Sequence, residues 1–127
     1  MKDLYSNVKA VPAIAPAVKS AAGDGSTIDV QGFGSLLFVI NTGAIAGDGD
    51  FSVEVQDSAT GSGDWAAAAA VDVQGTIPAT LAATSAYRVG YTGSKRYVRL
   101  ALTKEGGTSI ALGAVAILGH PAVAPVA

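Results

Sequence analysis

The chain contains no cysteine and only one histidine. The missing thiol excludes disulfide scaffolds, zinc–thiolate sites and cysteine nucleophiles. A Ser-His-Asp arrangement would have a single available base, His120, in the proline-rich stretch GHPAVAPVA. Gly32-Phe33-Gly34 lacks the third glycine and the following helix of a dinucleotide-binding loop, and it is typical of a bend between strands. We therefore expect no enzyme and no bound cofactor.

Charge is also scarce. Charged residues make up 14% of the chain, against roughly 25% in ordinary globular domains. Because so little charge covers only part of an isolated surface, the composition favours a subunit that buries much of itself against protein partners. The net charge of −2 argues against attraction to nucleic acid or to anionic lipid.

No apolar run is long enough to cross a membrane. The longest uncharged stretch, residues 106–127, is interrupted by glycine, proline and His120. Its apolar centre of about ten residues falls short of the ~20 that a membrane span needs. The N-terminal stretch imitates a signal peptide, but Asp3 and two prolines interrupt it. We expect a soluble protein of about one domain, without membrane contact.

The chain does contain β-strand patterning. In Asp50–Ser58, DFSVEVQDS, apolar and polar residues alternate, which predicts a half-buried strand. The continuous apolar run Leu36–Thr42 suits a strand covered on both faces. Further strands are expected at residues 26–30, 86–92, 95–103 and 108–118. Glycine-rich turns separate these runs, and together they predict an all-β fold, an antiparallel β-sandwich or jelly roll.

The alanine-rich stretch Trp65–Val71, WAAAAAV, has two interpretations. Alanine is the best helix former, so one or two helical turns are one possibility. Seven residues make a poor isolated helix, however, and the preceding ATGSGD is a natural hairpin turn. We predict an extended strand.

Both ends of the chain mix proline with alanine and valine. Proline forbids a helix interior and favours extended or polyproline conformation. We therefore predict an extended N-terminal arm at residues 1–22, a β-sandwich at residues 23–119 and an extended C-terminal tail at residues 120–127. Because an apolar arm gains stability by lying on a neighbour, we expect it to contact other subunits. Its candidate interface residues are Leu4, Tyr5, Val11 and Ile14.

Acidic and basic residues are segregated along the chain. Between Ser20 and Tyr87 there are eight acidic residues and no lysine or arginine. Between Arg88 and Lys104 there are five basic residues and no acidic one. Two arrangements fit this order. Basic and acidic strands lie side by side within one sheet, or the two patches meet between subunits.

The stretch Tyr87–Thr103, YRVGYTGSKRYVRLALT, interleaves basic and aromatic residues. Nucleic-acid surfaces share this pattern, but the eight acids elsewhere oppose such binding. We interpret residues 91–96 as the turn of a β-hairpin, with Gly93 free to take positive φ. The exposed face of the hairpin is then expected to contact protein. Its candidate interface residues are Arg88, Tyr91, Lys95, Arg96 and Arg99.

The stretch Gly47–Asp50, GDGD, has the composition of a calcium site or of a tight turn. Clustered carboxylates such as those of Asp48 and Asp50 suit Ca²⁺. The stretch lacks the spacing and the distal glutamate of an EF-hand loop. The pattern favours a plain Asp/Gly turn and leaves ion binding open.

Four stretches together resemble a known group of proteins: DVQGFGSLLFVINTG, DFSVEVQDSATGSGDW, VGYTGSKRYVRLALT and the closing ILGHPAVAPV. They are similar to capsid decoration, or cement, proteins encoded among the head genes of tailed phages and prophages. The resemblance runs roughly from Asp29 to Val126, and its most recognisable pieces are GYTGSKRYVR and Gly119-His120-Pro121.

The resemblance implies a β-sandwich virion protein, often a homotrimer, that sits on the outer capsid surface over junctions between major capsid protein subunits. Assembly would take place in the host cytoplasm. The family pattern offers no active-site residues to carry over. Two alternatives remain: a tail or baseplate component, or a carbohydrate-binding β-sandwich that recognises a host surface. A sugar site would need exposed aromatic residues in a groove, and only Trp65 and four tyrosines are available.

Overall fold

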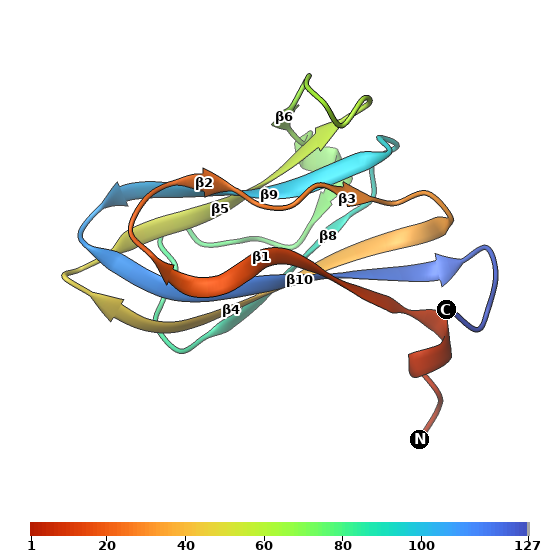
Figure 1. The fold of residues 1–127 in the computed structure, drawn as a ribbon, viewed down its shortest axis with the longest axis horizontal. Coiled ribbons are helices and arrows are strands. Elements are labelled where there is room, and N and C mark those ends of the chain that lie inside the picture. Colours follow the sequence, from red (N-terminus) through yellow and green to blue (C-terminus); the bar gives the residue numbers. More distant parts are fainter. Residues whose placement is uncertain (127) are drawn as a thin grey trace.

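Two antiparallel β-sheets face each other in the computed structural model, which describes residues 1–126 (Figure 1). Sheet A has the strand order β1-β10-β4-β8-β7, and sheet B has the order β2-β9-β5-β6, with β3 paired to β9. The strands are β1 (Lys9–Lys19), β2 (Gly23–Asp24), β3 (Ile28–Asp29), β4 (Phe33–Ala46), β5 (Asp50–Ser58), β6 (Ala66–Ala67), β7 (Val73–Gln74), β8 (Ala86–Tyr91), β9 (Tyr97–Gly106) and β10 (Ser109–Pro121). The predicted all-β sandwich is confirmed.

In the described residues 1–126, helix is limited to two single turns of 3₁₀ type, η1 (Tyr5–Asn7) and η2 (Ala70–Asp72). Within residues 1–126, no helix is long and apolar enough to cross a membrane. The predicted strand over Trp65–Val71 is only partly correct, because the chain is extended at Ala66–Ala67 and then turns into η2.

The core lies between the sheets and follows the alternation of the strands. Phe38 and Ile40 of β4 and Phe51 of β5 are fully buried. The strand predicted at Asp50–Ser58 matches β5. On β4 the run Leu36–Thr42 was predicted to be covered on both faces. Every second side chain there is buried, but Leu37 and Val39 point to the outer face and are only partly covered.

Several short connections pass from one sheet to the other, among them β4–β5, β8–β9 and β9–β10, because β4, β8 and β10 belong to sheet A while β5 and β9 belong to sheet B. Residues 92–96 are therefore not a hairpin turn, as predicted, but a connection from β8 in sheet A to β9 in sheet B. The GDGD stretch forms the β4–β5 turn, with positive φ at Gly47 and Asp48 and a bond from Gly49 N–H to Ala46 O of 3.2 Å.

The proline-rich segment near the N-terminus is a strand of sheet A and not a free arm. β1 pairs with β10 from Lys9 to Lys19, with register shifts between Pro12 and Ile14 and between Ile14 and Ala17. Ala13 and Ile14 belong to the hydrophobic core. Prolines fit here because β1 is an edge strand, whose outer side needs no N–H donor. The extended conformation was predicted correctly, but the sandwich begins at Lys9 and not at residue 23.

The C-terminal boundary also differs slightly from the prediction. β10 continues to Pro121, two residues into the predicted tail at residues 120–127. The following residues turn back over the sandwich, since Ala122 N–H donates to Gly32 O (2.8 Å) and Val126 N–H donates to Ser6 O (2.9 Å). Ala127 lies outside the described residues.

Backbone hydrogen bonds and one side chain join the two sheets along their open sides. On one side, Gly25 N–H donates to Leu100 O of β9 (2.6 Å), and Ser26 N–H donates to Ala13 O of β1 (2.8 Å). On the other side, the long connection between β7 and β8 places Leu81 in the core, and its N–H donates to Phe51 O (2.9 Å). Both links hold sheet A in a fixed position over sheet B.

Candidate protein-binding surface

The outer faces of the two sheets differ in polarity. The outward side chains of β5 and β9 in sheet B include Ser52, Gln56 and Arg99, which hydrogen-bond across the strands. The outward side chains of β4 and β10 in sheet A are mostly apolar, with Leu37 opposite Ile117 and Val39 opposite Val115. A solvent-facing sheet normally carries polar residues on its outer face. Sheet A departs from this rule.

An open groove of about 1100 Å³ runs over the outer face of sheet A. It is lined by β1, β4, β8 and β10, and none of its lining residues is charged. We call this surface the apolar groove. Its outward-facing residues are Ala10, Pro12, Pro16, Val18, Val39, Asn41, Gly43, Ala86, Ala111, Gly113 and Val115.

Small residues make the groove hollow. Gly113 lies under Pro16, and a Cβ atom on it would be 2.9 Å from Pro16 Cβ. The other outward positions of the groove hold alanine, glycine, proline, valine and one asparagine, so no long side chain fills the space. Val115 at the centre of the face remains 41% exposed. Large contiguous apolar patches on a protein surface typically mark interaction sites or ligand-binding grooves.

On the polar face of sheet B, Arg99 finds its interaction partners within the same chain. Arg99 Nε donates to Gln56 Oε1 (2.9 Å), and the guanidinium also lies 3.4 Å from Asp24 Oδ2. The same guanidinium stacks over Trp65, with Cζ 4.3 Å from the ring centroid. Arg99 is therefore held on three sides by its own chain.

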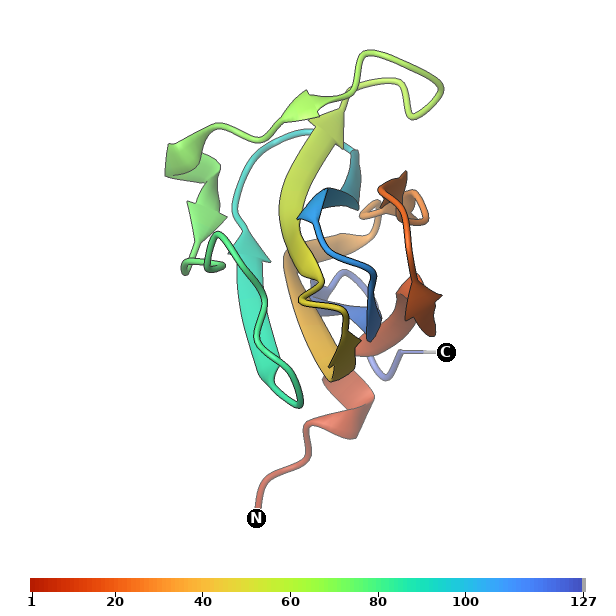
Figure 2. The ribbon, with the colours of Figure 1, turned by 90° about the vertical axis from the view of Figure 1, so that its left-hand side faces the viewer.

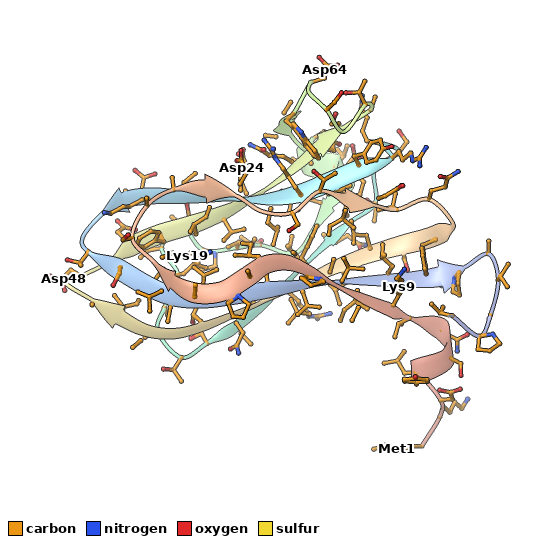
Figure 3. The ribbon with its side chains drawn as sticks, viewed as in Figure 1. Met1, Lys9, Lys19, Asp24, Asp48 and Asp64 are labelled. Carbon is orange, nitrogen blue, oxygen red and sulfur yellow. The ribbon has the colours of Figure 1, made fainter. Side chains whose placement is uncertain are left out.

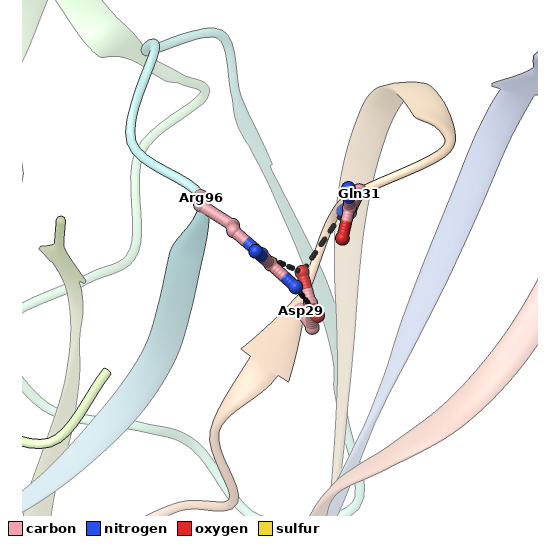
Figure 4. A network of polar contacts seen from close by, with 3 residues as sticks. All are labelled: Asp29, Gln31 and Arg96. Carbon is pink, nitrogen blue, oxygen red and sulfur yellow. Dashed lines mark hydrogen bonds and ion pairs between the residues drawn. The ribbon is translucent and has the colours of Figure 1, made fainter. Parts of the chain in front are cut away.

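Arg96 is held in the same way. Its guanidinium donates two hydrogen bonds to Asp29, from Nε to Oδ1 (2.9 Å) and from Nη2 to Oδ2 (2.8 Å), as Figure 4 shows. The backbone N–H of Gln31 donates a third bond to this carboxylate (3.0 Å). The hydrogen bond from Arg96 lowers the pKa of Asp29. Of the two arrangements that the charge order allowed, these two pairs follow the one within a single chain.

The structure separates the predicted interface residues into three groups. Ile14 and Tyr91 are buried, so they are not available to a partner, and this part of the prediction is wrong. Arg96 and Arg99 are engaged within the chain. The others remain accessible at least in part: Leu4, Tyr5, Val11, Arg88 and Lys95. The apolar pair Ala13 and Ile14 could have indicated a core position in the sequence, but the neighbouring prolines favoured the interpretation as a free arm.

Tyr91 has a structural role that sequence reasoning missed. Its hydroxyl donates to Asp57 Oδ2 of sheet B (2.8 Å) and accepts from Lys95 N–H (3.2 Å). The β8–β9 connection thus wraps around the ring, and Gly93 leaves room for it. Burial, together with the hydrogen bond to Asp57, raises the pKa of Tyr91 to about 12.

Replacing Tyr91 with phenylalanine should cost about 1–3 kcal/mol, because buried Asp57 loses its donor. Wild-type stability should fall as the pH rises from about 10 through 12, since the folded chain holds the phenolic proton more tightly than the unfolded chain. The Tyr91→Phe variant should lose this part of the pH dependence. Urea unfolding midpoints at neutral and alkaline pH measure both effects. Tyr5→Phe, at an exposed tyrosine, should change neither.

Residues 1–126 contain no group of three or more His, Cys, Asp or Glu side chains placed to hold a metal ion. Asp50 accepts a hydrogen bond from Thr80 Oγ1 (2.7 Å), and Asp48 lies in the β4–β5 turn. His120 Nδ1 lies 2.9 Å from Ser35 Oγ at an exposed position.

The fold is similar to a solved structure of phage origin. The crystal structure of the SPBc2 prophage-derived protein YomS matches with a TM-score of 0.58 and 12% sequence identity, over 88% of this chain and 92% of that chain. At this identity the likeness concerns the fold alone. No family model and no curated protein matches the chain. The comparison therefore relates the sandwich to that of a prophage-derived protein.

Proposed function

We propose that the chain is a non-enzymatic structural protein of a phage particle, which binds the outer surface of the capsid shell and stabilises it. The observation that carries the proposal is the apolar groove on sheet A, whose lining residues are uncharged and which nothing in the described chain covers. The resemblance of the sequence to decoration proteins and the fold shared with a prophage-derived protein support it.

The mechanism in this role is mass action. A protein that binds the closed shell but not its free subunits stabilises the shell by its binding free energy. Because many equivalent sites on the shell are occupied, a modest stabilisation at each site adds up over the particle. In a homotrimer, the linked contacts of the three subunits would also bind more tightly together than one contact alone. The low charge of the chain suits this role, since the centres of protein–protein interfaces are depleted of charged residues.

A carbohydrate-binding role receives less support from the aromatic residues. Trp65 is stacked under Arg99, Tyr97 lies beside Arg96, and Tyr91 is buried. A sugar ring stacks on an open aromatic face in a groove, and the apolar groove is lined by no aromatic residue. The tail or baseplate alternative shares the structural role and differs in the number of copies per particle.

Val115→Lys should weaken attachment to shells at least about tenfold, because it places a charge in the centre of an apolar contact. The assay is co-sedimentation of the purified chain with expanded shells assembled from the major capsid protein of the same phage genome. Val71→Lys is the matched control, because Val71 is an exposed valine outside the groove. It should bind like the wild type.

The thermal unfolding midpoint of both variants should stay near that of the wild type, since both positions face solvent. A wild-type chain that stays in the supernatant with intact shells would contradict the capsid role. Counting copies in purified particles separates head from tail, because a decoration protein is present in hundreds and a tail part in far fewer.

A further inference from the structure

A small hollow lies beside the apolar groove on the outer face of sheet A. Its volume is about 310 Å³, and its walls come from three neighbouring strands. It is lined by Leu37 of β4, Gln74 and Gly75 at the end of β7, and Arg88 and Gly90 of β8. Figure 2 shows the short β7, in green, beside the end of β8, in teal. We call this hollow the Arg88 pocket.

A glycine leaves the pocket open. Gly90 is paired with Leu37 on one side and with Gln74 on the other, and cross-strand partners share a face of the sheet. Gly90 has no side chain to fill the space between these two. A Cβ atom at Gly90 would lie 2.9 Å from Gln74 Oε1, so the amide group of Gln74 lies over the floor of the pocket.

Arg88 brings an unpaired positive charge to this pocket. The chain contains three arginines. Within residues 1–126, Arg96 forms an ion pair with Asp29 and Arg99 forms one with Asp24, whereas Arg88 forms none. Its side chain is exposed on the outer face of β8. Of the three guanidinium groups, that of Arg88 is therefore the one left for a partner.

The acidic residues of the same chain leave Arg88 without a carboxylate. Figure 3 shows Asp24 and Asp64 on the side of sheet B and Asp48 at the turn between β4 and β5. Asp72 comes just before β7, but it forms no ion pair with Arg88. The other residues that line the pocket are uncharged, as are all those that line the apolar groove. Arg88 is thus the single charge among the lining residues of both.

We propose that the Arg88 pocket receives one carboxylate side chain, an aspartate or a glutamate, from the protein that covers the apolar groove. Two groove residues are immediate neighbours of Arg88: Val39 lies directly across from it on β4, and Ala86 precedes it on the same face of β8. A partner that covers the groove therefore reaches Arg88 as well. The inference rests on the proposed function and names a chemical feature of the capsid partner.

The partner needs an anion at this point because a covered guanidinium needs a counter-charge. A charge that leaves water without one strongly opposes binding. A carboxylate offsets this cost, since its two oxygens match two N–H groups of a guanidinium. The amide of Gln74 offers a further donor beside Arg88. One such pair at the side of an apolar contact also fixes how the two surfaces are oriented.

Arg88→Gln should weaken shell binding at least about tenfold at low salt, because it leaves the partner's carboxylate without its counter-charge. The affinity of this variant should also depend less on salt than that of the wild type. The assay is co-sedimentation of the full-length chain with expanded shells at low and high salt. Lys95→Gln is the matched control, because Lys95 is an exposed cation that lines neither the pocket nor the groove. It should bind like the wild type.

Gly90→Ala separates a pocket from a general attraction between charges. The variant keeps Arg88 but places a methyl group on the floor, against the amide of Gln74. Gly90 does not have positive φ, so alanine fits the backbone there. We expect severalfold weaker shell binding and a melting temperature near that of the wild type. Wild-type affinity in this variant would reject the pocket, because Arg88 would then act by long-range attraction alone.

Arg88→Lys allows the partner's carboxylate to be identified. A water-soluble carbodiimide joins an amine to a carboxylate in contact with it, so that an amide bond forms and the carbodiimide leaves as a urea. After this treatment of the sedimented complex, peptide mass spectrometry should find position 88 joined to an aspartate or glutamate of the major capsid protein. The wild type, which has no amine at this position, should give no such product.

Two results of the cross-linking would overturn the proposal: the absence of any product at position 88, and a product with an acidic residue of a second copy of this chain. Equal shell binding by the wild type and Arg88→Gln would also reject it, while the capsid role would remain. A wild-type chain that stays in the supernatant would instead remove the capsid role itself, so the two failures are distinguishable.

Discussion

Removal of residues 1–16 should leave a chain that no longer unfolds cooperatively. The deletion takes away most of β1, including Ala13 and Ile14, whose side chains lie in the core. Losing a buried isoleucine side chain alone costs about 2–5 kcal/mol, and a domain of this size is stable by only about 5–15 kcal/mol. The deletion also exposes the edge of β10 and removes the carbonyl of Ala13 that Ser26 N–H contacts.

Circular dichroism melting and amide chemical-shift dispersion measure this outcome. Removal of residues 1–8 is the control, because it stops just before β1 and removes no residue of the core. The shorter deletion should keep a cooperative transition within a few degrees of the wild type. If the chain without residues 1–16 melted as cooperatively as the wild type, β1 would be an appended arm and not part of the sandwich.

Gly25→Ala should destabilise the chain by about 2–3 kcal/mol and lower its melting temperature by about 8–12 °C. A Cβ atom at this position would lie 2.5 Å from Ala13 O and 2.8 Å from Leu100 O. Both distances are too short for a carbon against a carbonyl oxygen, so the backbone must shift. The shift would break the bonds that join sheet A and sheet B on this side.

Gly23→Ala is the matched control, two residues earlier in the chain. A Cβ atom at Gly23 meets nothing within 4 Å, and neither glycine has positive φ. The melting temperature of Gly23→Ala should equal or slightly exceed that of the wild type, because alanine reduces the conformational freedom of the unfolded chain. Equal melting temperatures for the two variants would show that the close approach at Gly25 is not needed for stability.

The contrast between the two outer faces links these stability arguments to function. Sheet B uses Asp24 and Asp29 to neutralise Arg99 and Arg96 on its own surface. Sheet A has an apolar groove instead, and the rigid joints at Gly25 and Leu81 hold that face in place. A preorganised apolar face binds protein with little entropy cost. The scarcity of charged residues therefore shows mainly on the outer face of sheet A, where the groove lies.

Local patterns in the sequence determined the strands. The alternation in Asp50–Ser58 predicts β5 at its observed bounds, because inward and outward side chains differ in every second position. Prolines at 12 and 16 excluded a helix, and the segment is extended. The Asp/Gly turn at Gly47–Asp50 follows from the preference of its residues for positive φ.

Sheet membership depended on the tertiary structure. A turn sequence such as Thr92–Arg96 does not distinguish a hairpin from a connection between facing sheets, because both reverse the chain with the same residues. Here the chain passes from sheet A to sheet B. The hydroxyl of Tyr91, at the end of β8, supports this path because it donates a hydrogen bond to Asp57 of β5 in sheet B. In the same way, Ile14 next to Ala114 of β10 made a proline-rich segment an edge strand.

Identifying the candidate surface required both the sequence and the tertiary structure. Composition determined that the chain is poor in charge and suited to buried contacts, and the order of charges predicted that acids and bases meet. Only the folded chain determined that Arg96 and Arg99 find their acids within the same subunit. Outward residues of β1, β4, β8 and β10 come from distant parts of the sequence, so no local pattern brings them into one groove. Strand order in sheet A does so, because pairing places every outward side chain beside those of its neighbours.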